Sequence, residues 1–257
     1  MDLIENQIAS NLINRHPWEL ARYDFIEERV KEMYNSFESN KVSIVDIGCG
    51  DAYVITRLSK TFLFNKVFAI DINFNNDLIS SLSKKNSSIN FLKSIEEVKF
   101  ELDTSYIFLM NDVIEHIEKD NDFLINLKQK TLTDIKKFYF FISVPSFDLL
   151  FSQHDLDLGH YRRYNLSKLL NYNNILNLKV TNKGYFFINL LLLRSFSKLN
   201  QLLFKKATSK IGVSEWKRGQ LITRIIYLFL KFDISFNKIF NNKIPGLSCY
   251  IIFNRNE

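Results

Sequence analysis

The stretch Val42–Ala52 constrains the fold of this chain more than any other. Its first part, Val42–Ile47, is rich in β-branched and apolar residues, which is typical of a buried strand. Gly48 and Gly50 follow at once, and glycine allows both a positive φ and the close approach of a ligand to the backbone. Helical sequence resumes at Tyr53. A buried strand, a glycine turn and a helix N-terminus in succession are typical of a nucleotide-type site in an α/β protein.

A second predicted strand ends near an acidic residue, at a sequence distance from the glycine turn that is typical of nucleotide-binding folds. Val67–Ile72 is another apolar run, and its acid, Asp71, lies 23 residues after Gly48. An acid at the end of the second strand, about 20 residues beyond the glycine turn, is placed to accept hydrogen bonds from ribose hydroxyls. Two ordinary strand ends are the alternative, because a tight turn needs glycine for steric reasons alone.

The acids of the glycine turn bear on the kind of nucleotide. Asp46 lies near the end of the strand and Asp51 lies in the turn itself. Two carboxylates would repel the pyrophosphate of a dinucleotide. They favour instead a ligand that carries an amino group and a sulfonium.

The spacing Asp46-x-Gly48-x-Gly50-x-Ala52 resembles the first motif of the class I S-adenosylmethionine (SAM)-dependent methyltransferases. That motif reads acid-x-Gly-x-Gly-x-Gly, so this chain departs from it only at Ala52. The resemblance implies SAM as the cofactor, S-adenosylhomocysteine (SAH) as the product and no metal. The cofactor-binding residues expected on this basis are Asp46, Gly48, Cys49, Gly50, Asp71, Ile72, Asn111 and Asp112.

Later segments extend the resemblance over roughly residues 15–254. Tyr106–Ile117, with its Asp-Val-x-Glu-His ending, resembles the fourth strand and following turn of that family, and Ser143–Ser146 resembles the end of the fifth strand. His154–Tyr164 resembles a stretch found in a bacterial subgroup often linked with polysaccharide and lipid-linked sugar pathways. His16–Arg22 resembles the N-terminal cap of the same subgroup.

The third strand departs from the family pattern. Many members place an acid just after it, which binds the adenine amino group, but here Lys93 and Ser94 follow Leu92. Recognition of adenine is therefore left open between backbone groups and the nearby Glu96 or Glu97.

Alternating strands and helices predict a mostly parallel seven-stranded sheet with helices on both faces, the Rossmann-like class I methyltransferase fold of the α/β class. The expected strands are 42–47, 67–71, 89–92, 106–110, 138–144, 178–185 and 247–253. The expected helices of the core are 53–60, 76–84, 122–130 and 165–171. We expect one domain over 1–257, with a helical cap at 1–39, a core at 40–186 and 244–257, and a helical insertion at 187–243.

The insertion contains two apolar runs with basic flanks, Phe186–Arg194 and Leu221–Phe232. Neither reaches the ~20 apolar residues of a membrane-spanning helix, so both predict amphipathic helices. Such helices suit an oligomer interface, a lid over the acceptor or an anchor on the membrane surface. A buried helical subdomain is the alternative.

Charge is distributed unevenly along the chain. Residues 1–149 carry 17 Lys and Arg against 23 Asp and Glu, a net charge of −6, whereas residues 150–257 carry 17 against 5, a net charge of +12. The basic half suggests an anionic partner, such as a phosphorylated substrate, a membrane surface or nucleic acid, and a lysine-rich solvated surface is the alternative. Two cysteines and an acidic, non-apolar N-terminus predict a reduced, cytoplasmic protein, with peripheral contact at the inner face of the membrane as a further hypothesis.

Methyl transfer to a hydroxyl needs a group that takes the hydroxyl proton, and histidine is the usual choice. His154 is preferred narrowly, because Asp155 beside it is placed to orient the imidazole. His116, after the fourth strand, is the second candidate, with a structural role for the pair Glu115–His116 as the alternative. The expected substrate-binding residues are His160, Tyr161, Arg162, Arg163 and Tyr164, since adjacent arginines suit phosphate or carboxylate.

The chain is therefore predicted to be a methyltransferase that acts on a small-molecule or glycan acceptor, by O-methylation of a sugar or lipid-linked saccharide. Metal binding is not expected, since the sequence shows no zinc-type ligand spacing and no clustered acids. Two alternatives stay open: a catalytically inactive SAM-binding module that serves as an assembly partner, and a nucleic-acid or protein methyltransferase. No nucleic-acid partner is expected, because no recognised nucleic-acid motif accompanies the basic half. The oligomeric state stays open.

Overall fold

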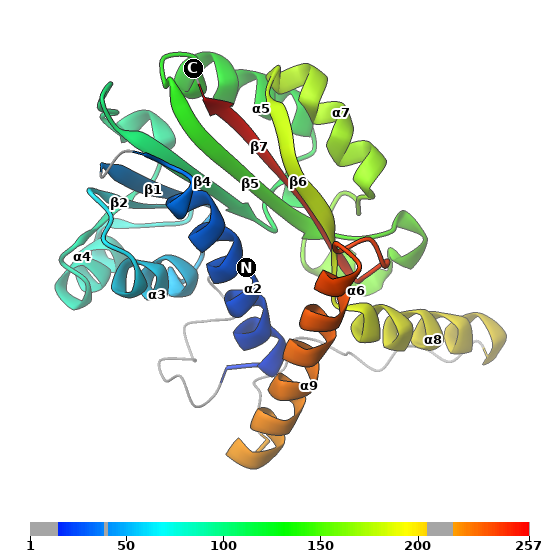
Figure 1. The fold of residues 1–257 in the computed structure, drawn as a ribbon. Coiled ribbons are helices and arrows are strands. Elements are labelled where there is room, and N and C mark those ends of the chain that lie inside the picture. The colour runs from blue at the N-terminus through cyan, green and yellow to red at the C-terminus, as the bar shows by residue number, and fades with distance from the viewer. Residues whose placement is uncertain (1–14, 39–40, 205–217, 257) are drawn as a thin grey trace.

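A computed structural model describes residues 15–38, 41–204 and 218–256. Its described part contains a seven-stranded sheet in the order β3-β2-β1-β4-β5-β7-β6 (Figure 1). The strands are β1 (Val42–Ile47), β2 (Val67–Ile70), β3 (Ile89–Leu92), β4 (Ser105–Asn111), β5 (Lys137–Pro145), β6 (Lys179–Phe186) and β7 (Ser248–Asn256). Pairing is parallel from β3 through β5, and β7 runs antiparallel to both β5 and β6. The predicted fold class is confirmed.

Helices cover both faces of this sheet. They are α2 (Pro17–Asn35), α3 (Tyr53–Thr61), α4 (Asn76–Lys85), α5 (Asp120–Leu127), α6 (Gln153–Asp157), α7 (Leu166–Leu176), α8 (Ile188–Phe204) and α9 (Gln220–Ile239). Side chains from α2, α3, α4 and α9 join one hydrophobic core, and side chains from α5 and α7 join a second core on the opposite face. Because both faces are covered, every residue of β1 is buried, as the apolar run predicts.

Several element boundaries differ from the prediction. The helix expected at 122–130 begins earlier, at Asp120, and changes after Leu127 into a π-helical turn at Lys128–Leu132. The helix expected at 165–171 continues to Leu176, where Asn177 takes the left-handed conformation that ends a helix. Part of the cap expected at 1–39 lies outside the described residues, and the described helix starts at Pro17, since proline favours the first helical turn.

Two helices lie between β6 and β7, where the helical insertion was predicted. Residues 205–217 of the predicted insertion lie outside the described residues. Figure 1 shows α8 and α9 extending away from the sheet, with α9 beside α2. The contact with α2 includes a hydrogen bond of 2.6 Å from the Tyr227 hydroxyl to Asp24 and an ion pair between Lys238 and Glu28. Within the described part of the chain, no helix has the length and hydropathy that crossing a membrane requires.

Candidate functional site

The glycine turn after β1 has a left-handed backbone at both of its glycines. Gly48 and Gly50 have φ values of 71° and 56°, in the left-handed region. A Cβ on Gly48 would lie 2.5 Å from Cγ2 of Val113, which follows the neighbouring strand β4. Gly48 therefore lets the loops after β1 and β4 meet at the carboxyl edge of the sheet. Ala52, where the family motif has its last glycine, is also left-handed, with φ 60°.

Asp71 lies at the end of β2, directly beside this turn. Its Oδ2 accepts a hydrogen bond of 2.9 Å from the Gly50 N–H, and its Oδ1 accepts one of 3.0 Å from the Asn73 N–H. The side chain is buried, with 6% of its residue surface exposed. Asp71 thus fixes the turn, and each of its oxygens keeps a lone pair for a further donor.

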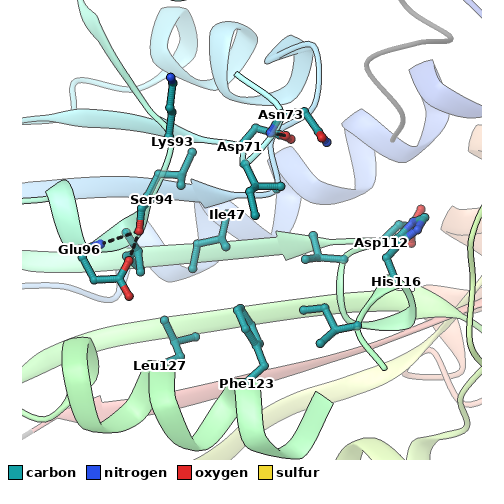
Figure 2. Close-up of a pocket in the computed structure, with 16 residues that line it drawn as sticks. Ile47, Asp71, Asn73, Lys93, Ser94, Glu96, Asp112, His116, Phe123 and Leu127 are labelled. Atoms are coloured by element: carbon teal, nitrogen blue, oxygen red, sulfur yellow. Dashed lines mark hydrogen bonds between the residues drawn. The ribbon is translucent and has the colours of Figure 1, made fainter. Parts of the chain in front are cut away.

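A cavity of about 560 Å³ opens along the carboxyl ends of β1, β2 and β4. Figure 2 shows Asp71 and Asn73 on one side, Phe123 and Leu127 on the opposite side, and Asp112 with His116 at one end. Five residues predicted from the sequence line it: Gly48, Asp71, Ile72, Asp112 and His116. Ile72 is apolar yet 86% exposed, so its side chain offers apolar contact to a ligand in the cavity.

The other end of the cavity is formed by the segment after β3, where the family acid is missing. Lys93, Ser94 and Glu96 line the cavity there. Glu97 does not, because its Oε1 accepts hydrogen bonds from the backbone N–H groups of Lys93 and Ser94, at 3.1 and 2.9 Å. Of the two glutamates that the sequence left open, Glu96 is the one that reaches the cavity. Nothing in the sequence distinguished them, since the choice depends on which one caps the short helix at Ile95–Glu97.

A smaller cavity of about 30 Å³ lies on the other side of the glycine turn. Asp46, Cys49 and Asn111 line it, and Gly48 borders both cavities. Asn111 Oδ1 accepts a hydrogen bond of 3.0 Å from the Ser143 hydroxyl, whereas its Nδ2 is buried without a hydrogen-bond partner in the described structure. A buried amide N–H without a hydrogen-bond partner is costly, so a ligand that accepts a hydrogen bond from Asn111 Nδ2 would stabilise this arrangement.

Two arginines, one just before helix α2 and one within it, form ion pairs that sequence reasoning did not predict. Arg15 forms an ion pair with Asp51, and Arg22 forms one with Asp112. Burial tends to raise the pKa of Asp112, but Arg22 outweighs it and the net shift is downward. These pairs join residues 36 and 90 positions apart, so no local spacing could have revealed them. The cap is therefore tied to the loops after β1 and β4 by charge.

Asp46 is more buried than Asp51 and Asp71, the other acids beside the glycine turn. It is 2% exposed, and burial raises its pKa to about 7. A carboxyl group in this state ionises readily when a cation approaches, because the cation replaces the lost hydration.

The segment His154–Tyr164 has contacts that differ from the prediction. Asp155 was expected to orient His154, but its Oδ1 accepts a hydrogen bond of 2.8 Å from Arg163 Nε and lies 3.4 Å from His160 Nδ1. Asp155 also caps its own short helix through the Ser152 N–H and hydroxyl, at 2.9 and 3.0 Å. Among the described residues, the side-chain partners of Asp155 thus include Arg163, Ser152 and His160, and orientation of His154 by Asp155 stays a prediction. The catalytic role predicted for His154 and Asp155 stays a prediction.

The predicted substrate arginines and tyrosines of this segment also have internal partners. Arg162 forms an ion pair of 2.8 Å with Asp120 and donates to the Glu118 carbonyl. Tyr164 donates to the same Asp120 at 2.8 Å, and burial raises the pKa of its hydroxyl far above the usual range. Tyr161 is the exception, with 54% of its surface exposed.

The predicted base His116 and the predicted substrate residue His160 come together. Their rings lie 4.5 Å apart, edge to face. Beside them is Glu115, which is fully buried, and both its carboxylate oxygens lack a hydrogen-bond partner among the described residues. Burial, then the nearby Asp112, raises the pKa of Glu115 well above its usual range. His154, half-buried, is not among the residues that line the 560 Å³ cavity.

Comparison with solved structures gives the fold a name. A SAM-dependent methyltransferase from Archaeoglobus fulgidus superposes over 98% of both chains with a TM-score of 0.51 and 15% identity. The chain has the fold of the class I SAM-dependent methyltransferases. Magnesium protoporphyrin IX methyltransferase from Synechocystis, solved with bound SAH, superposes over 92% of this chain and 84% of that one, with a TM-score of 0.50 and 11% identity.

Sequence relatives agree with this methyltransferase fold. The chain is 32% identical to a ubiquinone biosynthesis O-methyltransferase from Rickettsia bellii over 112 residues, which are 42% of this chain and 45% of that protein. The corresponding protein of Rickettsia typhi is 32% identical over 133 residues, 47% of this chain and 52% of the relative. The chain thus spans about half the length of the curated relatives it matches. No family model matches the chain.

Proposed function

We propose that this protein is a SAM-dependent methyltransferase that transfers a methyl group to a hydroxyl of a small acceptor. The observation that carries the proposal is the convergence of Asp46, Gly48, Asp71 and Asn111 on two adjoining cavities at the carboxyl edge of the sheet. In open α/β sheets this edge, where the strand order reverses, is where ligands bind. Here it reverses between β1 and β4.

The residues of the two cavities fit the parts of SAM. Asp46 and the unpartnered amide of Asn111 suit the methionine ammonium and carboxylate, respectively. Asp71 suits the ribose hydroxyls, and the exposed Ile72 suits one face of the adenine ring. Ser94 and Glu96 supply a hydroxyl and a carboxylate at the end of the cavity where the adenine edge would lie.

When bound, SAM supplies a methyl group on a sulfonium, an activated leaving group. The chain has to hold the acceptor in line, exclude water and accept a proton. We place the deprotonation at the end of the cavity that Asp112 and His116 form, since His116 borders the cavity and His154 does not. As the acceptor oxygen bonds to the methyl carbon, the S–C bond breaks and the hydroxyl proton passes to His116 or to water at that end of the cavity.

Two acceptor classes have support. The resemblance of His154–Tyr164 to a subgroup linked with polysaccharide and lipid-linked sugar pathways favours a sugar hydroxyl. The similarity to ubiquinone biosynthesis O-methyltransferases favours a ubiquinone precursor and supports oxygen as the methylated atom.

A membrane surface is the partner that we propose for α9. Six apolar side chains, spaced three or four residues apart, form one stripe along the helix and are between 42% and 75% exposed: Leu221, Ile225, Leu228, Phe232, Phe236 and Ile239. The opposite face of α9 is buried in the protein. An exposed apolar stripe with a basic surround suits an anionic bilayer, which would also bring a lipid-linked acceptor to the site.

Calorimetric titration with SAM tests the proposed activity at its first step. We expect Asp71→Ala to weaken SAM binding by about 1–3 kcal/mol, the cost of losing charge-assisted hydrogen bonds. Asp77→Ala is the matched control, because Asp77 is exposed on α4 and does not line the cavity, and it should bind SAM as the wild type does. Absence of SAM binding by the wild type would contradict the proposal. Binding without turnover over a panel of sugar and quinone-precursor acceptors would favour the non-catalytic module.

Flotation with vesicles tests the membrane contact. We expect the wild type to float with vesicles that contain anionic phospholipid at low salt. The double variant Leu228→Ser, Phe232→Ser should lose this binding, whereas Leu63→Ser, which removes a side chain 90% exposed but distant in sequence from α9, should keep it. Equal flotation of all three proteins, or of none, would refute the contact.

A further inference from the structure

Glu115, His116 and His160 form a cluster beside the proposed SAM cavity that the reaction described above leaves unexplained. One ligand-type atom of each residue lies within 4.8 Å of the corresponding atoms of the other two. Glu115 and His116 come from the short helical turn Ile114–His116 after β4, and His160 comes from the chain that follows α6. The backbone joins the two segments, since the Tyr161 N–H donates a hydrogen bond of 2.8 Å to the Glu115 carbonyl.

Of the three residues in the cluster, Glu115 gives the strongest indication of a bound ligand. It is fully buried, and neither carboxylate oxygen has a hydrogen-bond partner in the described structure. Arg22, whose guanidinium interacts electrostatically with Glu115, is already engaged with Asp112 and with the Ser143 hydroxyl, which it contacts at 3.2 Å. A buried carboxyl without a partner costs several kcal/mol unless it is neutral or meets a cation. A bound cation would satisfy both oxygens.

The surroundings of His160 suit a metal ligand as well. Its Nδ1 lies 3.4 Å from Asp155 Oδ1, so a carboxylate stands beside the ring. Metal-binding histidines commonly donate their second ring N–H to a carboxylate, which orients the ring and makes the ligand atom more basic. Asp155 forms an ion pair with Arg163 and accepts a hydrogen bond from the Ser152 N–H. These contacts hold the carboxylate that lies beside the His160 ring.

We infer that Glu115, His116 and His160 bind a divalent transition-metal ion at the acceptor end of the cavity. One carboxylate and two imidazoles are a donor set for Zn²⁺, Mn²⁺ or Fe²⁺, and they leave coordination positions open. Mg²⁺ prefers oxygen ligands and is expected to bind more weakly. The sequence reasoning missed this site because His160 lies 44 residues after His116, with no zinc-type spacing between them.

The site deepens the proposed function and rests on it for its role. His116 both borders the cavity and belongs to the cluster, so an ion held by the cluster would lie beside the proposed acceptor end of the cavity. A hydroxyl bound there has a lowered pKa, and its proton passes to water. The oxygen then forms the new bond to the methyl carbon while the S–C bond breaks. In this arrangement His116 binds the ion and does not accept the hydroxyl proton.

Titration of metal-free protein with Mn²⁺, in the absence of SAM, tests the site. We expect one ion per chain, and we expect Glu115→Gln and His160→Gln each to weaken binding at least tenfold. His154→Gln is the matched control, because it removes a histidine of the same segment that is outside the cluster, and it should bind Mn²⁺ as the wild type does. Circular dichroism of each variant checks that it is folded.

Three outcomes overturn the inference: no Mn²⁺ binding to the wild type, unchanged binding in both cluster variants, or an equal loss in His154→Gln. A parallel titration with SAM separates this inference from the proposed function. SAM binding without Mn²⁺ binding removes the metal site and keeps the methyltransferase, whereas Mn²⁺ binding without SAM binding does the reverse.

Discussion

The two segments predicted to bind ligands, Val42–Ala52 and His154–Tyr164, differ in what their polar groups contact. Around the first, Asp46 and Asn111 face a cavity, and the Asn111 amide has no hydrogen-bond partner within the described structure. In the second, Asp155, Arg162, Arg163 and Tyr164 bond to one another or to neighbouring elements. The first segment thus keeps polar groups available to a ligand, whereas most polar groups of the second are engaged within the protein.

The largest expected effect tests whether the second segment is structural. Asp155→Ala should lower the free energy of unfolding by about 3–5 kcal/mol, because it leaves the buried Arg163 guanidinium without its partner. Urea unfolding measures this change. The control is Lys168→Ala, which breaks the exposed pair with Asp148 and should cost less than about 1 kcal/mol. Equal, small losses in both variants would mean that the second segment does not hold the fold.

A change of pH tests whether the first segment serves a ligand. Burial raises the pKa of Asp46 to about 7, so below that pH the carboxyl is protonated in the free protein. A ligand ammonium requires the ionised form, so binding releases a proton and SAM affinity should rise by up to about tenfold per pH unit between pH 5 and 7. Asp46→Asn should remove this dependence. A flat profile in the wild type would place Asp46 outside the ligand site.

The smallest expected effect concerns the backbone of the first segment. Ala52 has a left-handed conformation, which costs a residue with a Cβ about 1–2 kcal/mol. Ala52→Gly should therefore stabilise the protein by about 0.5–1 kcal/mol, after the entropy cost of glycine is subtracted. Ala21→Gly, in the middle of α2, should instead destabilise it. Thermal unfolding of the two variants measures both changes. A loss of stability in Ala52→Gly would contradict the proposed backbone strain at Ala52.

Local patterns account for what could be predicted. Strands such as Val42–Ile47 and Ile89–Leu92 were placed correctly because short, mostly apolar runs between turn residues are typical of strands. The glycine positions at 48 and 50 followed from the same local reasoning. The helix at Asp120–Leu127 was misplaced at both ends because the π-helical turn after it leaves no mark in hydrophobic periodicity.

Partner choice could not be predicted, since it depends on tertiary distance. Asp155 is adjacent to His154 in sequence, yet the fold brings it to Arg163 and His160. Arg22 meets Asp112 across 90 residues. Glu115 was read only as a neighbour of His116, because its complete burial depends on elements that pack around it from elsewhere in the chain.

A crystal structure of the protein grown with SAH tests the central claim most directly. The account predicts SAH in the cavities beside the glycine turn, with the ribose hydroxyls bonded to Asp71, the adenine on Ile72 and the amino acid group at Asp46 and Asn111. SAH bound elsewhere, or cavities without SAH at a saturating concentration, would contradict it.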